Sequence, residues 1–195
     1  MTLRLATGNF RGKKIASTDK ARELRPTQAL LREAIINISQ NLVDFEEANI
    51  LDIYAGVGSV GLEFLSNDAK FVYFVEKDPR CVKLLKSNIL SLGCESKTKV
   101  LNLTLPSSIK RVKDPEMEGF DLIFADPPYK LKANLFFKNI DFILENALMK
   151  PDSLLICEYA DREYFKGFEN YQDSLKLIKE KKYGDSFLIF LQKIS

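Results

Sequence analysis

The most distinctive chemical grouping in the sequence is Asp126-Pro127-Pro128-Tyr129, which follows a short apolar run. The two prolines lack backbone N–H groups and stiffen the turn, so the Asp126 carboxylate and the Pro127 carbonyl become acceptors with fixed positions. The Tyr129 ring adds a flat stacking surface. This combination suits an amine on a planar base, because hydrogen bonds from both N–H groups favour a pyramidal nitrogen whose lone pair can attack an electrophile. The alternative is a plain Pro-Pro turn at the end of a strand.

A glycine-rich turn lies upstream, in the stretch LDIYAGVGSVG at residues 51–61. Gly56 and Gly58 permit a sharp bend and the close approach of a ligand to the backbone. Asp52, four residues before Gly56, disfavours a pyrophosphate and suits a cationic ammonium group. The pattern D-x-x-x-G-x-G therefore resembles the first motif of S-adenosylmethionine (AdoMet) methyltransferases, in which the loop, here with Tyr54, wraps the methionine portion. A dinucleotide-binding loop and a turn that only packs a helix onto a sheet remain as alternatives.

Glu76 ends the next apolar run, at residues 71–75. A carboxylate at the carboxyl end of that strand can accept hydrogen bonds from both hydroxyl groups of a ribose. Taken alone, an acidic residue at a strand end is usually a solvated terminus. The glycine turn upstream favours the functional interpretation.

The elements that position these residues alternate between strand and helix. Short apolar runs rich in β-branched and aromatic residues predict strands buried on both faces, at Ile50–Tyr54, Phe71–Glu76, Lys99–Leu103, Leu122–Asp126 and Leu154–Tyr159. Helical periodicity lies between most of them, at about 60–67, 79–92 and 134–148. The alternation predicts a doubly wound α/β sheet with helices on both faces.

The two ends of the chain depart from this alternation. The segment Lys176–Tyr183 is followed by the turn dipeptide Gly184-Asp185 and then by the apolar run Ser186–Gln192, with no helix between, which predicts an antiparallel hairpin. Residues 3–15 predict a second, short hairpin, and a helix follows, for which Thr27 is a candidate N-cap. We expect a basic N-terminal extension over residues 1–40, packed on a main domain over residues 41–195.

Charge is distributed unevenly along the 195 residues. Residues 1–32 hold eight of the 29 Lys and Arg residues but two of the 27 Asp and Glu residues, so this segment carries +6 and the remainder −4. A basic N-terminal segment followed by a slightly acidic remainder suits phosphate binding, although a solvated Lys/Arg-rich surface would show the same charge.

Composition excludes several other classes of protein. Three widely spaced cysteines and no histidine argue against a disulfide framework and against a zinc site, so we expect no metal. No apolar run reaches the ~18 residues that a membrane-spanning helix needs. The first 14 residues contain basic residues but no apolar core of secretory length, so we expect no signal peptide. We expect a monomeric cytoplasmic protein without a membrane partner.

Together, the motifs indicate a resemblance to a known protein family. The chain contains G-N-F-R-G-K-K-I at residues 8–15, R-P-T at 25–27 and L-R-E-A-I-I-N-I at 31–38, ahead of the Asp-Pro-Pro-Tyr motif. These resemble, in order and over residues 3–192, the RsmD family of bacterial methyltransferases. That family acts on the exocyclic amine of guanine in small-subunit ribosomal RNA. The resemblance implies a class I AdoMet-dependent methyltransferase fold, Rossmann-like, with a seven-stranded, mostly parallel sheet.

The resemblance also implies roles for individual residues. Base-holding and catalytic roles fall on Asp126, Pro127, Pro128 and Tyr129, and AdoMet binding on Asp52, Tyr54, Gly56, Gly58, Glu76, Thr104 and Asp126. Contacts to 16S ribosomal RNA or to the assembling small subunit fall on Arg4, Phe10, Arg11, Lys13, Lys14, Arg25 and Arg32. Arg25, Thr27 and Arg32 are expected to line the side shared by cofactor and substrate.

One position departs from the family pattern. Where the family has an acidic residue or Asn after the third strand, this chain has Leu103-Thr104-Leu105-Pro106. Thr104 can hydrogen-bond an adenine edge but offers no carboxylate, so we expect weaker or backbone-based adenine recognition.

Two other functions stay open from the sequence. The same Asp-Pro-Pro-Tyr chemistry serves adenine amino-methyltransferases on DNA, but the chain shows no separate target-recognition domain. A non-catalytic RNA-binding assembly protein could also keep the fold.

Overall fold

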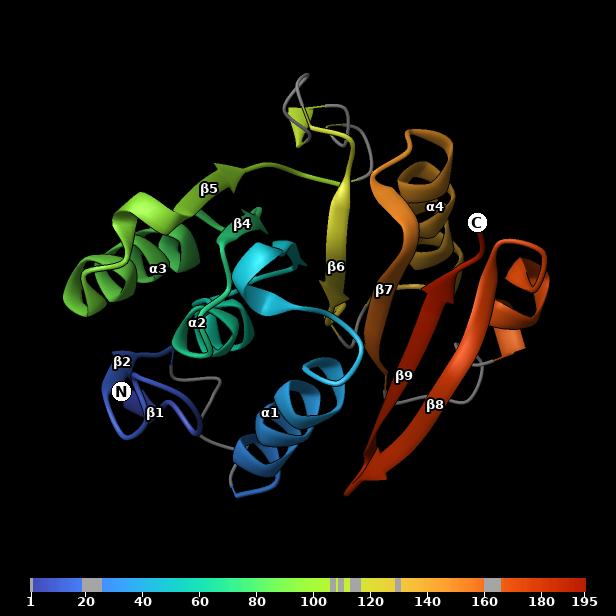
Figure 1. Cartoon of the computed structure of the whole chain (residues 1–195). Coiled ribbons are helices and arrows are strands. Elements are labelled where there is room, and N and C mark those ends of the chain that lie inside the picture. Colours follow the sequence, from blue (N-terminus) through green and yellow to red (C-terminus); the bar gives the residue numbers. More distant parts are fainter. Residues whose placement is uncertain are drawn as a thin grey trace.

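The computed structural model describes residues 2–18, 26–105, 108, 111–112, 117–128, 131–159 and 166–195. Within these residues the chain forms a seven-stranded sheet with the strand order β5-β4-β3-β6-β7-β9-β8 (Figure 1). The parallel strands are β3 (Asn49–Ile53), β4 (Phe71–Glu76), β5 (Thr98–Asn102), β6 (Phe120–Ala125) and β7 (Met149–Tyr159). Strands β8 (Leu175–Tyr183) and β9 (Ser186–Lys193) form an antiparallel hairpin, and β9 pairs antiparallel with β7. The predicted parallel sheet and terminal hairpin are both confirmed.

Strand β7 begins earlier than the sequence predicts, at Met149 instead of Leu154. Phe120 pairs with Met149 and Leu122 with Leu154, so the residues between Met149 and Leu154 bulge out of the β6–β7 ladder. Asp152, inside the bulge, has a φ of 60°. A bulge interrupts the apolar alternation, which explains why the sequence pattern shows the second half of the strand alone.

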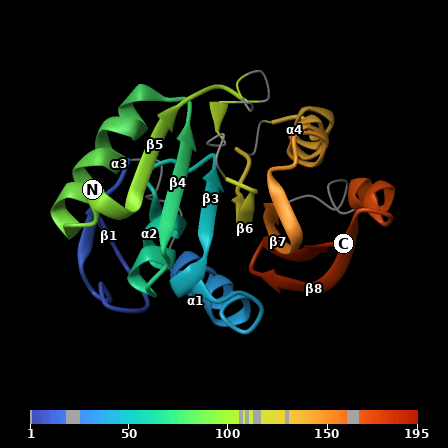
Figure 2. The same ribbon diagram turned by 45° about the horizontal axis from the view of Figure 1, so that its top comes forward.

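Different helices cover the two faces of the sheet (Figure 2). Helices α1 (Pro26–Ser39), α2 (Ser59–Ser66) and α3 (Pro79–Leu92) pack on one face, and α4 (Ala133–Glu145) packs on the other. Successive strand side chains point to opposite faces, so Ile50 lies in the α2-side core and Leu51 in the α4-side core. The α2-side core includes Ile35, Phe64, Phe74, Leu85, Phe124 and Ile156, and the α4-side core includes Phe136, Ile140, Ile143, Ile123 and Leu155.

Short elements complete the described part of the chain. Single 3₁₀ turns occur at η2 (Phe45–Glu47), η3 (Glu95–Lys97) and η5 (Glu169–Tyr171). Cys81, Cys94 and Cys157 are free thiols. Among the residues that the structure describes, none of the helices has the length and apolar character that crossing a bilayer requires.

The basic N-terminal segment forms the predicted hairpin, from β1 (Thr2–Arg4) and β2 (Lys14–Ala16). The hairpin is a separate two-stranded sheet that lies beside α2 and α3 (Figure 1). Leu5 and Ile15 are buried in the α2-side core, which anchors both arms of the hairpin. On α3, the Asn88 side chain accepts a hydrogen bond from the Ala16 N–H at 2.7 Å and donates to the Ala16 carbonyl at 3.0 Å.

Helix α1 begins one residue earlier than expected. Its first residue is Pro26, so Thr27 lies inside the helix and the prediction that Thr27 is the N-cap is wrong. Proline is favoured at the first helical position because its missing N–H would have no partner there and its φ is already helical.

Candidate active site

Three acidic side chains meet at the carboxyl ends of adjacent strands. Asp52 lies near the end of β3, Asp126 directly follows β6, and Glu158 is the penultimate residue of β7. The strand registers pair Asp52 with Phe124 and Ala125 with Cys157, which sets Asp126 and Glu158 side by side. By alternation all three side chains point to the α2 side of the sheet. The sequence placed Asp52 and Asp126 in one site, and the structure brings them together.

Asp52 is almost sealed from solvent, with 2% of its surface exposed. Its Oδ2 accepts the Gly61 N–H at 3.0 Å, which ties β3 to the first turn of α2. Burial raises the pKa of Asp52 to about 8, the nearby Glu76 carboxylate adds to this, and the Gly61 hydrogen bond partly opposes it. A positive charge arriving beside Asp52 would therefore favour the loss of its proton.

The glycine turn is shaped by backbone conformations that side chains disfavour. Gly58 has a φ of 85°, and a Cβ there would lie 2.3 Å from the Leu85 side chain. Gly56 has a φ of 56° with open space around the position of a Cβ. A ligand can therefore approach the Gly56 backbone closely, while Gly58 packs the turn against α3.

Glu76 faces this turn from the end of β4. Its Oε2 accepts the Gly56 N–H at 2.8 Å, and its Oε1 accepts the Asp78 N–H at 2.7 Å. Each carboxylate oxygen has a second lone pair, so Glu76 can still accept hydrogen bonds from two hydroxyl groups. The predicted juxtaposition of Glu76 and the glycine turn is present.

Tyr54 occupies an unusual conformation, with a φ of 65°. The positive φ turns its side chain to the α4-side core, where the Asn139 amide hydrogen-bonds the tyrosine hydroxyl. Such conformations cluster at functional sites because the surrounding structure must hold them. The Tyr54 side chain is thus directed away from the face that carries Asp52, which leaves its backbone to face the glycine turn.

Asp126 and Pro128 are exposed, whereas Pro127 between them is buried. The Leu131 N–H donates to the Pro128 carbonyl at 2.7 Å, which holds the turn after the prolines. Surrounding protein atoms, followed by the carboxylates of Glu158 and Asp52, raise the pKa of Asp126 well above its usual range, although the residue is exposed. Tyr129 lies outside the described residues.

Glu158 is the site residue that the sequence analysis missed. It is half-buried, and burial raises the pKa of its carboxyl, while a hydrogen bond from the Ser186 side chain works in the opposite direction. The same reasoning that selected Glu76, an acid at the end of an apolar strand, would have found it.

The adenine side of the predicted cofactor site lies beyond β5. Thr104 is exposed two residues after the end of that strand. The Asn102 side chain at the strand end donates to the carbonyls of Glu76 and Lys77, at 2.8 and 3.0 Å. Asn102 thus braces the loop that follows Glu76.

The predicted RNA-binding residues of the hairpin loop are mostly at the surface. Arg11, Lys13 and Lys14 are exposed, and the Lys13 ammonium lies 4.7 Å from the centre of the Phe10 ring. Phe10 is half-buried against the α2-side core. Arg4 is exposed and donates to the Gly12 carbonyl at 2.7 Å. Arg25 and the side chain of Thr27 lie outside the described residues.

Arg32 does not fit the surface role predicted for it. It is 5% exposed, its Nε lies 3.1 Å from Glu63 Oε1, and its Nη2 donates to the Arg4 carbonyl at 2.9 Å. The sequence cannot show this pairing, because Glu63 lies on another helix. We therefore correct the prediction that Arg32 contacts RNA: it joins α1, α2 and the N-terminal hairpin.

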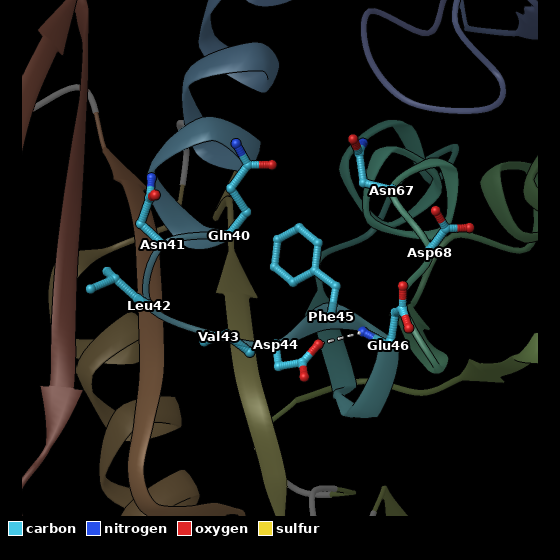
Figure 3. A pocket seen from close by; sticks show the side chains of 9 residues that line it. All are labelled: Gln40, Asn41, Leu42, Val43, Asp44, Phe45, Glu46, Asn67 and Asp68. Atoms are coloured by element: carbon cyan, nitrogen blue, oxygen red, sulfur yellow. Dashed lines mark hydrogen bonds between the residues drawn. The ribbon is translucent and has the colours of Figure 1, made fainter.

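A separate hollow lies away from these residues (Figure 3). Its volume is about 520 Å³, and its lining comes from residues 40–46, which precede β3, and from Asn67 and Asp68, which precede β4. It therefore lies at the amino-terminal edge of the sheet, opposite to the edge with Asp126. Within the described ranges no cluster of Cys, Asp or Glu residues has the arrangement of a metal site.

The chemistry of these side chains fits AdoMet. Carboxylates at positions 52, 76 and 126 supply negative charge for a sulfonium and an ammonium group, Glu76 retains acceptors for a ribose diol, and the Gly56 backbone is open. With its strand order and the glycine turn after β3, the structure has the class I AdoMet-dependent methyltransferase fold. The model of the RsmD family, described as "Conserved hypothetical protein 95", matches residues 3–192. The chain belongs to this family.

Individual relatives agree with this assignment. Ribosomal RNA small subunit methyltransferase D of Haemophilus influenzae is 33% identical over 184 residues, which are 93% of this chain and 89% of the relative. A structure described as an Escherichia coli methyltransferase superposes with a TM-score of 0.81 at 26% identity, covering 100% of this chain and 99% of the other. A methyltransferase solved with S-adenosylhomocysteine shares the fold at 12% identity, with a TM-score of 0.71 over 85% of this chain and 49% of the other.

Proposed function

We propose that this protein uses AdoMet to methylate the exocyclic N2 amine of a guanine in 16S ribosomal RNA, free or in the assembling small subunit. The observation that carries the proposal is the placement of Asp126 and the diproline turn at the end of β6, next to Asp52. The Haemophilus influenzae relative is named for the RNA of the small ribosomal subunit, which supports this choice of substrate.

AdoMet supplies an electrophilic methyl group on a sulfonium centre. The residues that would hold it are Asp52 and Glu76 by charge and hydrogen bonding, the backbone of residues 54–58, and Thr104 at the adenine edge. Asp126 and the Pro127 carbonyl would accept hydrogen bonds from the guanine amine and orient its lone pair. Catalysis then rests on positioning and on oriented dipoles, which together can contribute several orders of magnitude in rate.

The methylated amine must lose one proton. Asp126 is placed to accept it, because the same carboxylate would bind the amine. Although Asp126 is exposed, surrounding protein atoms and the carboxylates of Glu158 and Asp52 raise the pKa of its carboxyl well above the usual range. A carboxylate of raised pKa is a better base than an ordinary aspartate. Asp126 would thus both orient the amine and receive its proton.

The test of this proposal is methyl transfer to isolated nucleic acids. Small ribosomal subunits and 16S ribosomal RNA from a bacterial strain lacking the gene are incubated with the protein and AdoMet labelled in its methyl group. We expect the label in N2-methylguanosine after digestion to nucleosides. Label in N6-methyladenine of a DNA substrate would favour the alternative base methyltransferase, and RNA binding without transfer would favour a non-catalytic assembly protein.

We further propose that residues 1–40 form the RNA-binding extension of a methyltransferase domain at residues 41–195. Its candidate contacts are the exposed Arg4, Arg11, Lys13 and Lys14, the outer edge of Phe10, and Arg25. The buried Leu5 and Ile15 fix the hairpin on the domain, so these basic groups would be held in one orientation.

The double variant Arg11→Ala with Lys13→Ala is expected to weaken RNA binding and to reduce its dependence on salt. Each lost phosphate contact to single-stranded RNA lowers the slope of log K against log salt by about 0.7, so the pair lowers it by about 1.4. Binding is measured by filter retention across a salt series, and AdoMet affinity by calorimetry. Lys179→Ala with Lys181→Ala, two exposed lysines of β8, is the matched control and should keep the wild-type slope. An equal loss of AdoMet affinity in the hairpin variant would show that the hairpin is structural.

A further inference from the structure

Glu158 stands next to the proposed base-holding group in a way that no motif predicted. Ala125 pairs with Cys157 in the last residue pair of β6 and β7. The residues that follow them, Asp126 and Glu158, therefore lie side by side. Phe124 and Ile156 before them lie in the α2-side core, which places both acids on that same face. Adjacent strands are about 4.8 Å apart, so a flat base held at Asp126 lies within reach of Glu158.

The surroundings of Glu158 leave it available to a ligand. It is half-buried at the end of β7, and its backbone pairs with Leu188 of β9. The Ser186 side chain hydrogen-bonds the carboxylate, and no basic side chain among the described residues forms an ion pair with it. One hydroxyl satisfies a small part of the acceptor capacity of a carboxylate. An acid that has no ion-pair partner among the described residues costs stability in such a position, which is the usual mark of a functional group.

The ring nitrogen next to the amine determines which base a carboxylate at the position of Glu158 can bind. In guanine, the ring nitrogen N1 beside the N2 amine carries a hydrogen and donates. In adenine, N1 beside the N6 amine carries a lone pair and accepts. A carboxylate next to the amine-binding group therefore attracts guanine and repels adenine.

We propose that Glu158 selects guanine by accepting a hydrogen bond from its N1–H while Asp126 and the Pro127 carbonyl hold the adjacent N2 amine. This assignment rests on the proposed function, which it deepens by naming the group that distinguishes the base. Burial raises the pKa of the Glu158 carboxyl, and the hydrogen bond from the Ser186 hydroxyl partly opposes this rise.

The experiment compares guanine with 2-aminopurine at the methylated position of a small-subunit RNA assembled by ligation. 2-Aminopurine keeps the 2-amine but has a lone pair at N1. The wild type should favour guanine by about tenfold or more in kcat/KM, the effect of one hydrogen bond to a charged group. The Glu158→Gln variant, whose neutral amide can also donate, should narrow this preference to about threefold or less. Its melting temperature should be no lower than that of the wild type, because the change removes a partly buried charge, and its AdoMet affinity should match.

Glu145→Gln makes the same chemical change at the exposed end of α4, and should keep the wild-type base preference. A Glu158→Gln variant with the wild-type preference overturns the assignment, whether or not its stability or AdoMet affinity has changed. A wild-type protein that methylates no guanine in this RNA would instead overturn the proposed function, and the assignment with it. A smaller preference for guanine over 2-aminopurine in the Glu158→Gln variant, with unchanged AdoMet binding, supports both the assignment and the proposed function.

Discussion

Replacing Asp126 with alanine is expected to lower the rate of methyl transfer by about 100- to 1,000-fold, the usual cost of losing one positioned group at a reacting centre. The variant loses the acceptor that orients the amine and the base that takes its proton. Asp126→Asn keeps one oxygen acceptor but loses the charge, so its rate should lie between those of the wild type and the alanine variant. Single-turnover transfer to small-subunit RNA at saturating AdoMet measures this step.

The control for this prediction is Asp173→Ala, which removes an exposed aspartate near the start of β8 and should leave the rate unchanged. AdoMet binding, measured by calorimetry, should fall far less in the Asp126→Ala variant than the rate does. If AdoMet affinity falls as steeply as the rate, Asp126 serves the cofactor and another group must hold the base. If neither changes, the diproline turn is only a structural turn.

The parts of the site that could be predicted from the sequence are those that local patterns encode. Asp52, Glu76 and Asp126 each lie at or near the end of a short apolar run, and parallel strands bring their carboxyl ends to one edge of a sheet. Glu158 follows the same rule on β7, but a bulge interrupts the first half of that strand. No glycine turn or diproline motif lies next to Glu158 to mark the end of β7 as part of the site.

The parts that could not be predicted depend on pairings between distant segments. Arg32 and Glu63 are 31 residues apart and meet only because α1 packs beside α2. A lone arginine in a basic segment has the same appearance in sequence whether it faces phosphate or a buried carboxylate. The positive φ of Tyr54 is likewise invisible in the sequence, because it is imposed by the turn and by the contact with Asn139.

The acidic residues at the edge of the sheet lower the stability of the protein and favour the binding of a cation. Asp52 has a pKa of 3.8 when exposed and about 8 in the folded protein, so the folded state holds its proton more tightly than the unfolded chain. The free energy of unfolding therefore declines as pH rises from about 4 to 8 through this group. A bound cation removes that penalty, because it stabilises the ionised carboxylate. The acidic edge thus favours the cationic methyl donor over ligands without a positive charge.

The largest expected effect on stability comes from Arg32→Ala, which should lower the free energy of unfolding by about 3–5 kcal/mol. Glu63 has no exposed surface, and its carboxylate also accepts the N–H groups of Ala6 and Thr7, at 2.7 and 3.1 Å. Loss of the guanidinium leaves this buried charge without its counter-ion. Urea denaturation measures the difference, and hydrogen exchange of residues 2–16 should quicken because the hairpin is held to α2 through the same carboxylate.

Lys70→Ala is the control, since it breaks the exposed ion pair between Lys70 and Glu47 and should cost at most about 1 kcal/mol. The double variant Arg32→Met with Glu63→Gln should regain part of the loss. Its neutral amide oxygen can still accept a backbone N–H, and no buried charge is left unpaired. An Arg32→Ala protein within about 1 kcal/mol of the wild type would show that the ion pair does not stabilise the hairpin.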